Sequence, residues 1–280
     1  LTFYYDNEII NSPPRLIKDI NQLPFPARDL TNFKKYRFLL SKGSIFTTLI
    51  TARGCPFVCT FCDEGRMKFR ANTASRIVDE IVECQEKYDI HTFFIFDSTF
   101  TVQRKRAVEF CEELIRRKVD IKFDIRTRVD LMNENILQAL KAAGCIRIQY
   151  GIESGNNQIL KTISKTITVE KAAQTVEQTK SYGFEILCDF MIGLPGEHRP
   201  QIEETIQLAL SLPIDYAQFS ITTPYPNTDL YHDGIRQGLF DDYWKTFSLH
   251  PTSDFVAPYW CENFSREELD DILASAYSRF

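Results

Sequence analysis

The sequence lacks the features of a membrane, secreted or nucleic-acid-binding protein. None of its apolar runs approaches the roughly 18 to 20 residues that span a bilayer, and no basic start with an apolar stretch and a small-residue cleavage site is present. A formal net charge of -5 gives no extended positive field for nucleic acid or an anionic membrane. We therefore expect a cytoplasmic protein that acts on a small-molecule or peptide-like substrate.

Few candidate metal ligands lie outside one short segment. Histidine is scarce, with only four in 280 residues. Of the eight cysteines, Cys55, Cys59 and Cys62 crowd into one stretch, whereas the other five are scattered. This crowding favours a metal site in a reducing compartment over a disulfide framework. We interpret the scattered cysteines as small buried hydrophobic residues.

The start of the chain shows little periodicity. Residues 1–44 contain Pro13, Pro14, Pro24 and Pro26, which favour extended or polyproline-like backbone over helix. We interpret this stretch as a lead-in or linker segment packed on something else. Because the chain opens without a methionine, we expect it to be an excerpt of a longer polypeptide.

A repeating order of strand-like and helix-like segments follows the lead-in. Short β-branched or aromatic runs alternate with amphipathic stretches, which indicates parallel strands joined by right-handed helical crossovers. Six strands are too few to close a barrel, so we predict an α/β fold: an incomplete (β/α)6 TIM-like barrel over 45–238, then a mixed C-terminal extension over 239–280. The six predicted strands are 47–52, 91–97, 121–127, 145–150, 184–192 and 216–222.

Helical periodicity fills the gaps between the predicted strands. Apolar residues recur on one face of segments 75–88 and 133–143, and Gly144 follows the second as the expected helix stop. Near the end of the chain, Ser265 and Glu268 have the spacing of a capping box, which predicts the start of a last helix.

One motif carries chemistry. The segment RGCPFVCTFC, at 53–62, follows the first predicted strand and has the spacing CxxxCxxC. Thiolates are the ligands of iron–sulfur clusters, and three cysteines leave one iron of a four-iron cluster open. A structural zinc site usually has four Cys or His ligands in two separated pairs, and no second pair is present. We favour a [4Fe-4S] cluster; zinc and three unrelated cysteines are the alternatives.

This motif, after the first strand of an incomplete α/β barrel, resembles the radical S-adenosylmethionine (SAM) superfamily. The resemblance extends over most of residues 47–235. It implies that Cys55, Cys59 and Cys62 hold the cluster and that the open iron chelates the amino and carboxylate groups of SAM. Reductive cleavage of SAM would then yield a 5′-deoxyadenosyl radical that abstracts hydrogen. No catalytic side chain beyond the cluster ligands is assigned.

Two further residues have implied roles in SAM binding. Phe61 precedes the third cysteine and would lie against the adenine; ordinary core packing is the alternative. Asp97 lies in the segment FDSTF, at 96–100, where many family members carry a Gly-Gly-Glu segment that contacts the methionyl amino group. Asp97 could accept that hydrogen bond, although the segment departs from the family's pattern.

The ends of the third and fourth predicted strands supply two more candidates. The segment YGIESG, at 150–155, resembles the family's Gly-Ile-Glu-Ser-Gly segment, which implies that Glu153 faces the SAM ribose or amino group. A solvated loop carboxylate is the alternative for Glu153. Two interpretations of Arg128 stay open: contact with the SAM carboxylate, or a simple pair with Asp130.

Two later loops also match the family. The segment MIGLPGE, at 191–197, has glycines that permit close backbone approach, and the resemblance implies that Gly193 and Pro195 line the SAM site. The segment TPYPNT, at 223–228, resembles a Pro-Tyr-Pro-Gly-Thr turn with Asn227 in place of glycine. Asparagine tolerates left-handed backbone, so we expect the turn to be kept.

The segment LPFPARDL, at 23–30, together with 53–56, resembles the subgroup whose barrel follows a cobalamin-binding domain, which implies methyl transfer or related radical chemistry. The D-x-H-x-x-G signature of histidine-on cobalamin modules is absent, so we expect any cobalamin module to lie upstream of Leu1. The alternatives are a cobalamin-free enzyme such as a methylthiotransferase, which typically needs a second cluster, and a non-catalytic iron–sulfur electron-transfer module. As an enzyme, the protein would draw electrons from a reductase or a flavodoxin- or ferredoxin-type donor.

Overall fold

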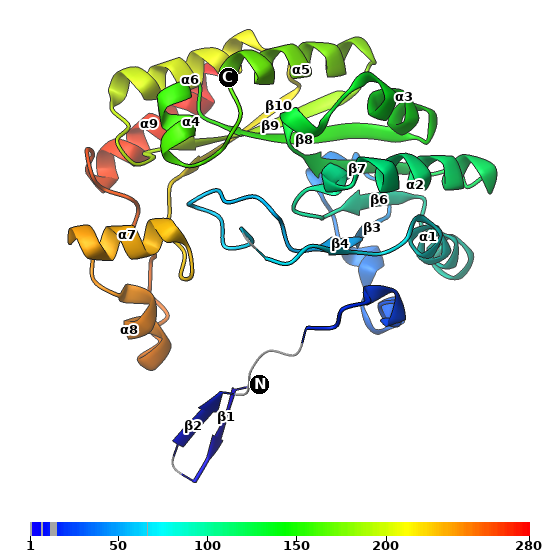
Figure 1. Ribbon diagram of the computed structural model, residues 1–280, viewed down its shortest axis with the longest axis horizontal. Coiled ribbons are helices and arrows are strands. Elements are labelled where there is room, and N and C mark those ends of the chain that lie inside the picture. The colour runs from blue at the N-terminus through cyan, green and yellow to red at the C-terminus, as the bar shows by residue number, and fades with distance from the viewer. Residues whose placement is uncertain (1, 7, 12–15, 66) are drawn as a thin grey trace.

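The computed structural model describes residues 2–6, 8–11, 16–65 and 67–280. Six segments rich in β-branched and aromatic residues form one parallel sheet in which each strand lies beside its predecessor, in the order β10-β9-β8-β7-β6-β3. The sheet curls but its two edge strands do not pair, so the predicted incomplete barrel of six strands is confirmed (Figure 1). The strands are β3 (Phe46–Leu49), β6 (Thr92–Ile95), β7 (Lys122–Thr127), β8 (Cys145–Glu153), β9 (Glu185–Ile192) and β10 (Tyr216–Ile221).

The first predicted strand, 47–52, is shorter than expected. β3 stops at Leu49, because the Thr51 N–H turns away from the sheet and donates to the Asp97 side chain at 2.6 Å. The chain then forms a separate two-residue strand, β4 (Ala52–Arg53), which pairs antiparallel with β5 (Arg70–Ala71). The segment between these two short strands carries the cysteine motif.

Amphipathic helices cover the outer face of the sheet, and loops occupy the inner face (Figure 1). Alternate residues of each strand point to opposite faces, and the outward set packs under the helices as the hydrophobic core. Gly144 follows the third helix with φ +92°, as predicted, and a Cβ there would lie 2.2 Å from the carbonyl oxygen of Ile121. The helices are α1 (Ala74–Tyr88), α2 (Arg104–Arg116), α3 (Glu134–Ala142), α4 (Asn157–Thr162), α5 (Val169–Ser181) and α6 (Arg199–Ser211).

The lead-in forms no α-helix in its described part. It contains a hairpin and then single turns of 3-10 helix, in keeping with its prolines. Arg28 ties it to the barrel: its guanidinium donates to the Thr47 hydroxyl and Thr48 carbonyl on β3, both at 3.1 Å, and to Glu80 on α1 at 2.6 Å. The elements are β1 (Thr2–Tyr5), β2 (Glu8–Asn11), η1 (Ile20–Gln22), η2 (Arg28–Leu30), η3 (Phe33–Lys35) and η4 (Leu39–Ser41).

Three helices follow the sheet. α7 (Asp229–Gln237) lies beside the cysteine-bearing loop, α8 (Tyr243–Leu249) lies below α7 in the view, and α9 (Arg266–Arg279) returns to pack on β10 (Figure 1). The predicted capping box is confirmed, since Ser265 and Glu268 exchange side-chain to backbone hydrogen bonds. Asn227 has φ +67°, so the expected left-handed turn before α7 is also present.

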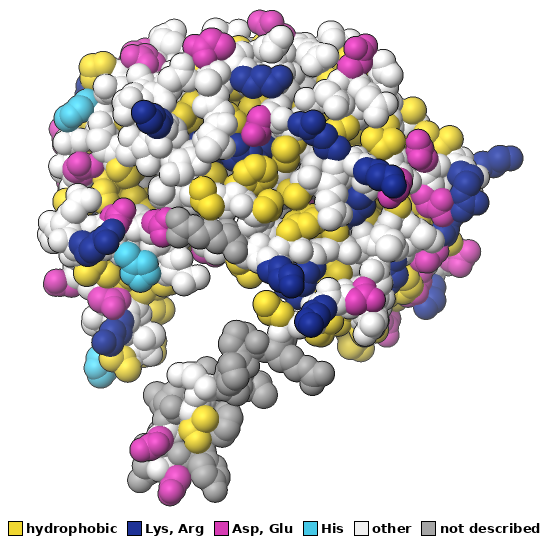
Figure 2. Space-filling view, in the orientation of Figure 1, with side chains coloured by type: hydrophobic (Ala, Val, Ile, Leu, Met, Phe, Trp, Pro, Cys, Tyr) yellow, Lys and Arg dark blue, Asp and Glu magenta, His cyan; other side chains and the backbone are white. Residues whose placement is uncertain are grey.

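The surface mixes charges of both signs. Figure 2 shows basic and acidic side chains interspersed on the face in view, with apolar side chains gathered near its centre. Within the residues that the structure describes, no helix is both long and apolar enough to cross a membrane.

Candidate active site

The cysteine-bearing loop leaves the C-terminal end of β3 and is closed at its base by the β4–β5 ladder. Gly54 opens the loop with φ +80°. A Cβ at this position would lie 2.7 Å from the carbonyl oxygen of Lys68, so only glycine fits without movement of the backbone. The ladder and the glycine hold the two ends of the loop together.

Cys55, Cys59 and Cys62 lie on this loop as free thiols, the first buried and the other two half-buried. Burial raises the pKa of Cys59, and Lys165 and Arg128 oppose that rise. Burial also raises the pKa of Cys62, with a further contribution from Cys59 and Cys55. These mutual effects mean that the three sulfurs share one electrostatic environment.

The three cysteines supply thiol groups, which are the ligand type that an iron–sulfur cluster needs. Among the described residues, no group of three or more Cys, His, Asp or Glu side chains is placed to hold one ion. A tetrahedral zinc with bonds of about 2.3 Å would draw its sulfurs to roughly 3.8 Å from one another. In a cuboidal cluster each thiolate binds a different iron, so the sulfurs stand farther apart. A cluster here would have Lys165 and Arg128 as nearby cations.

The backbone of Thr60 connects the cysteine-bearing loop to two other segments through hydrogen bonds. Its N–H donates to the Ile163 carbonyl at 3.1 Å, and its carbonyl accepts from the N–H of Leu230, in the first turn of α7, at 2.9 Å. The adjoining Phe61 is half-buried against the hydrophobic core, with the Lys165 ammonium 5.9 Å from its ring centroid. Phe61 therefore makes core contacts, and its contact with adenine stays a prediction.

Asp97 follows β6 and is turned into the protein. Its carboxylate accepts hydrogen bonds from the Thr51 N–H and hydroxyl, at 2.6 and 2.5 Å, and from the Ala52 N–H at 2.9 Å. Arg106 on α2 forms an ion pair with it at 3.3 Å. Burial raises the pKa of Asp97, while Thr51 and Arg106 oppose that rise. Both oxygens thus fix the segment that leads into the cysteine loop, and contact with SAM stays a prediction.

Glu153 ends β8 at a shift in register against β9, with φ +74°. Its carboxylate accepts a hydrogen bond from the Lys165 ammonium at 2.7 Å, and both side chains are buried. Burial would lower the pKa of Lys165, but Glu153 and then Cys59 raise it above its ordinary value. The interpretation of Glu153 as a solvated loop residue is wrong, because the residue is only 7% exposed. Its contact with SAM stays a prediction.

Arg128 connects three segments around the cysteine loop. Its Nε donates to Asp130 at 2.9 Å, and Nη2 donates to the carbonyl of Lys165 at 3.1 Å. The guanidinium lies 4.0 Å from the ring centroid of Phe57, and Nη1 is 3.9 Å from the Cys59 sulfur. The pair with Asp130 is therefore confirmed, and contact with the SAM carboxylate stays a prediction.

The loop after β9 is held by an internal carboxylate. Gly193 has φ +74°, and its N–H and that of Leu194 donate to the same oxygen of Glu197, at 2.8 and 3.0 Å. Burial raises the pKa of Glu197 to about 7 against these two bonds. A Cβ on Gly193 would lie 2.9 Å from the Leu269 side chain on α9, so α9 occupies the space left by the missing side chain. Pro195 is half-buried in this loop.

An ionic row closes the N-terminal end of the barrel. Asp124, Arg147 and Glu185 are register partners on β7, β8 and β9, and the arginine pairs with both acids, at 3.3 and 2.8 Å. The lead-in joins this row, since Leu40 accepts a hydrogen bond from Arg147 at 3.0 Å and Lys42 pairs with Glu185. Burial raises the pKa of Asp124 to about 7, although Arg147 opposes the rise.

A second polar row lies nearer the strand ends. Arg126 Nε donates to the side-chain oxygen Oε1 of Gln149 at 3.0 Å. The side-chain nitrogen Nε2 of Gln149 donates to both carboxylate oxygens of Asp189, at 2.9 and 2.7 Å. Sequence analysis missed both rows because no short motif marks them. The sequence does carry one signal for these rows, namely polar residues at every second position of otherwise apolar strands. Such residues all point to the same face of the sheet, here the inner face.

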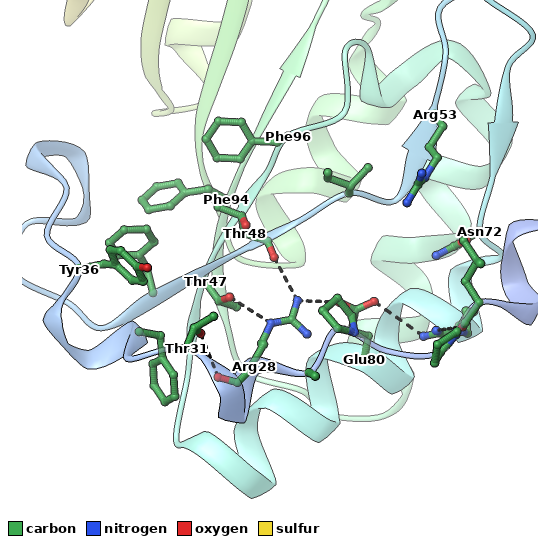
Figure 3. Close-up of a pocket in the computed structure, with 18 of the residues that line it drawn as sticks. Arg28, Thr31, Tyr36, Thr47, Thr48, Arg53, Asn72, Glu80, Phe94 and Phe96 are labelled. Atoms are coloured by element: carbon green, nitrogen blue, oxygen red, sulfur yellow. Dashed lines mark hydrogen bonds and ion pairs between the residues drawn. The ribbon is translucent and has the colours of Figure 1, made fainter. Parts of the chain in front are cut away.

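A cavity of about 630 Å³ lies between the lead-in and the β3 edge of the sheet (Figure 3). Arg53, directly before Gly54, and Phe96, directly after β6, border it, whereas none of the three motif cysteines does. Figure 3 shows Phe94 and Phe96 near one another along its wall. The cavity therefore adjoins the start of the cysteine loop without containing it.

Comparison with known proteins agrees with this geometry. Residues 49–209, more than half of the chain, match the family described as the Radical SAM superfamily. An uncharacterized methyltransferase of Pyrococcus horikoshii is 34% identical over 285 aligned residues, which cover 100% of this chain and 60% of that protein. The anaerobic magnesium-protoporphyrin IX monomethyl ester cyclase of Rubrivivax gelatinosus is 29% identical over 98% of this chain and 49% of its own length.

A solved structure shares the fold. The cobalamin-dependent S-adenosylmethionine radical enzyme OxsB superposes with a TM-score of 0.66 at 20% sequence identity, over 86% of this chain and 42% of its own. The chain thus spans between about half and three fifths of the length of the two curated relatives above.

Proposed function

Because this chain belongs to the radical SAM superfamily, we propose that Cys55, Cys59 and Cys62 bind a [4Fe-4S] cluster and that the open iron takes SAM. When bound, the cluster and SAM supply the reductive cleavage that starts radical chemistry. The observation that carries this proposal is the trio of free thiols on one loop at the C-terminal ends of the parallel strands, with Lys165 and Arg128 beside it. Active sites of such barrels lie at that end.

The surrounding side chains divide into two groups in this proposal. Phe61, Glu153 and Arg128, together with the loop at 193–195, line the SAM site next to the cysteine loop. Asp97 supports the SAM site without touching SAM, because its carboxylate already binds the backbone N–H groups of residues 51 and 52, which lead into the cysteine loop. The cluster potential and the orientation of SAM would then depend on buried charges whose positions the fold sets in advance.

We propose methyl transfer as the reaction, on a small-molecule substrate. Its support is the relative named as a methyltransferase, which matches the whole chain at 34% identity. The fold shared with OxsB, described as cobalamin-dependent, supports a cobalamin bound by a part of the protein outside this chain. The relative named as a cyclase favours a second candidate, radical ring closure, in the same site. Electrons would come from a reductase or a flavodoxin- or ferredoxin-type donor in the cytoplasm.

In this arrangement residues 45–238 form the catalytic barrel, residues 1–44 the lead-in from any upstream domain, and residues 239–280 an extension. Two residues of the lead-in hold it against the barrel. Arg28 is bound to β3 and α1, and Leu40 is bound to Arg147 at the closed end of the barrel.

The test is to reconstitute the protein anaerobically with iron and sulfide, reduce it, and record its electron paramagnetic resonance spectrum with and without SAM. We expect a cubane-type signal that changes when SAM is added. Cys59→Ala should abolish the signal, and Cys261→Ala, at an exposed cysteine outside the loop, should keep it. A cluster signal indifferent to SAM would favour an electron-transfer module, and the absence of any cluster would overturn the proposal.

The reaction class needs a second measurement on the full-length protein. Cobalamin that co-purifies with it, and a methyl group transferred from labelled SAM, would support methyl transfer. Cleavage of SAM without bound cobalamin would favour a cobalamin-free reaction in the same site.

A further inference from the structure

The inner face of the barrel carries a row of three side chains with unused hydrogen-bonding capacity. Arg126, Gln149 and Asp189 come from the neighbouring strands β7, β8 and β9. Their strand neighbours Ile125 and Ile148 are fully buried in the core beneath the helices, so alternation directs the row to the opposite, inner face. The row therefore faces the space that the curled sheet encloses.

The direction of the central amide is fixed by its two partners. A guanidinium can only donate hydrogen bonds, and an ionised carboxylate can only accept them. Gln149 must then turn its oxygen to Arg126 and its nitrogen to Asp189, as the structure shows. The row is thus polarised, with a cation at the β7 end and a carboxylate at the β9 end.

The cation at the β7 end has free donors. Arg126 uses only Nε in a hydrogen bond, and no residue that the structure describes accepts one from Nη1 or Nη2. The guanidinium carbon lies 4.2 Å from the ring centroid of Phe96, so the ring restricts where this planar fork can lie. Such a planar, oriented fork with free donors matches an oxyanion with two acceptor atoms.

The place of the row in the barrel suits a substrate. One layer below it, Arg147 pairs with Asp124 at 3.3 Å and with Glu185 at 2.8 Å, and these side chains close the barrel floor. One layer above it, Glu153 and Lys165 both influence the pKa of Asp189, which burial raises to about 7. Phe96 also borders the 630 Å³ cavity, so one ring lies between the row and that cavity.

We propose that Arg126, held by Gln149 and Phe96, binds an anionic oxygen group, a carboxylate or a phosphate, on the substrate. The apolar part of the substrate lies along Phe96 toward the cavity, and Asp189 orients the amide that orients the arginine. This inference rests on the proposed function, because it places the substrate in the space next to the SAM site.

The test compares two small probes that differ only in charge. 3-Phenylpropionate carries an aromatic ring and a carboxylate, and 3-phenylpropionamide is its neutral counterpart. Each is titrated by calorimetry into the reconstituted full-length protein saturated with SAM, so that the SAM carboxylate site is already filled. We expect the carboxylate to bind at least about tenfold more tightly than the amide, as a charge-assisted pair with an oriented guanidinium would give.

Three variants locate the preference. Arg126→Gln should remove it, and Arg126→Lys should keep only part of it, because lysine lacks the planar fork. Arg116→Gln, at an exposed arginine on α2, is the matched control and should leave the preference unchanged. Equal affinities of wild type for the two probes would overturn the proposal without use of any variant, as would an unchanged preference in a folded Arg126→Gln protein.

The titration separates the two proposals. Failure of wild type to bind SAM would overturn the proposed function, and SAM binding is measured first in the same samples. Bound SAM together with equal probe affinities would overturn only the assignment of Arg126.

Discussion

Glu153 and Lys165 form a buried ion pair, with 2.7 Å between Oε1 and Nζ, at the end of the strand that faces the cysteine loop. Neither residue is more than 7% exposed, so each charge relies on the other in place of water. The ammonium also lies close enough to Cys59 to oppose the rise of its pKa. The pair therefore links the stability of the barrel end to the charge at the proposed cluster.

Removal of one partner of this pair should be costly. Lys165→Met leaves a buried carboxylate without its cation, and such changes cost about 3–5 kcal/mol of unfolding free energy. The double variant Lys165→Met with Glu153→Leu should recover part of that loss, because no lone charge remains. Urea denaturation of the two single variants and the double variant measures the coupling; additive losses would contradict a direct pair.

Asp97→Asn tests whether this carboxylate supports the loop or contacts SAM. The amide cannot accept the three hydrogen bonds from residues 51–52 and also pair with Arg106, so the base of the cysteine loop should loosen. We expect a lower iron content per protein after reconstitution and a loss of about 3–5 kcal/mol in stability, as for other broken buried pairs. A full cluster that no longer responds to SAM would instead favour direct contact.

Gly193→Ala should destabilise more than Gly196→Ala. Both glycines have positive φ, of +74° and +70°, so both variants strain the backbone by about 1 kcal/mol or more. Only at Gly193 would the new Cβ also meet a neighbour, Leu269 at 2.9 Å, whereas nothing lies within 4 Å at Gly196. Chemical denaturation measures the difference between the two losses of stability. In a Leu269→Ala background, where the clash at position 193 is removed, this difference should be smaller. Equal losses of stability in the two variants would mean that Leu269 on α9 moves aside at little cost.

Glu197 should make stability depend on pH in an unusual direction. Its folded pKa is raised to about 7, so between the ordinary value of 4.5 and 7 the folded protein binds more protons than the unfolded chain. This contribution to stability is present below pH 4.5 and is lost as the pH rises to about 7. Glu197→Gln should flatten that part of the stability curve, and an unchanged slope would show that the carboxyl group ionises freely.

The fold, and the position of the three cysteines on one loop, could be predicted because their signals are local. Short β-branched or aromatic runs marked each strand, Gly144 marked a helix stop, and the spacing of the three cysteines marked their loop. The partners of those residues could not be predicted in the same way. Lys165 lies 12 positions from Glu153 in a segment with no motif, and only the shift in register at the end of β8 brings the two together.

The inner rows show the same limit more strongly. Arg126 and Gln149 lie 23 residues apart in sequence, and Gln149 and Asp189 lie 40 apart. They meet because the strands β7, β8 and β9 lie side by side in the sheet. Asp97 was expected to contact a ligand, but Arg106, in the first turn of α2, forms an ion pair with it. The sequence pattern predicts on which face of the sheet or helix such a residue lies, whereas its hydrogen-bond or ion-pair partner depends on tertiary packing.

Tyr277 covers part of the β10 edge of the open sheet. Its hydroxyl donates to the Phe219 carbonyl and accepts from the Phe219 N–H, both at 3.0 Å, as the backbone of a seventh strand would. Further along, the N–H of Trp260 donates to the Thr222 carbonyl at 2.8 Å. An exposed sheet edge is a template on which another chain can add itself, and these contacts remove part of that template along β10. A barrel can thus remain open for chemistry on its inside without inviting edge-to-edge aggregation along this strand.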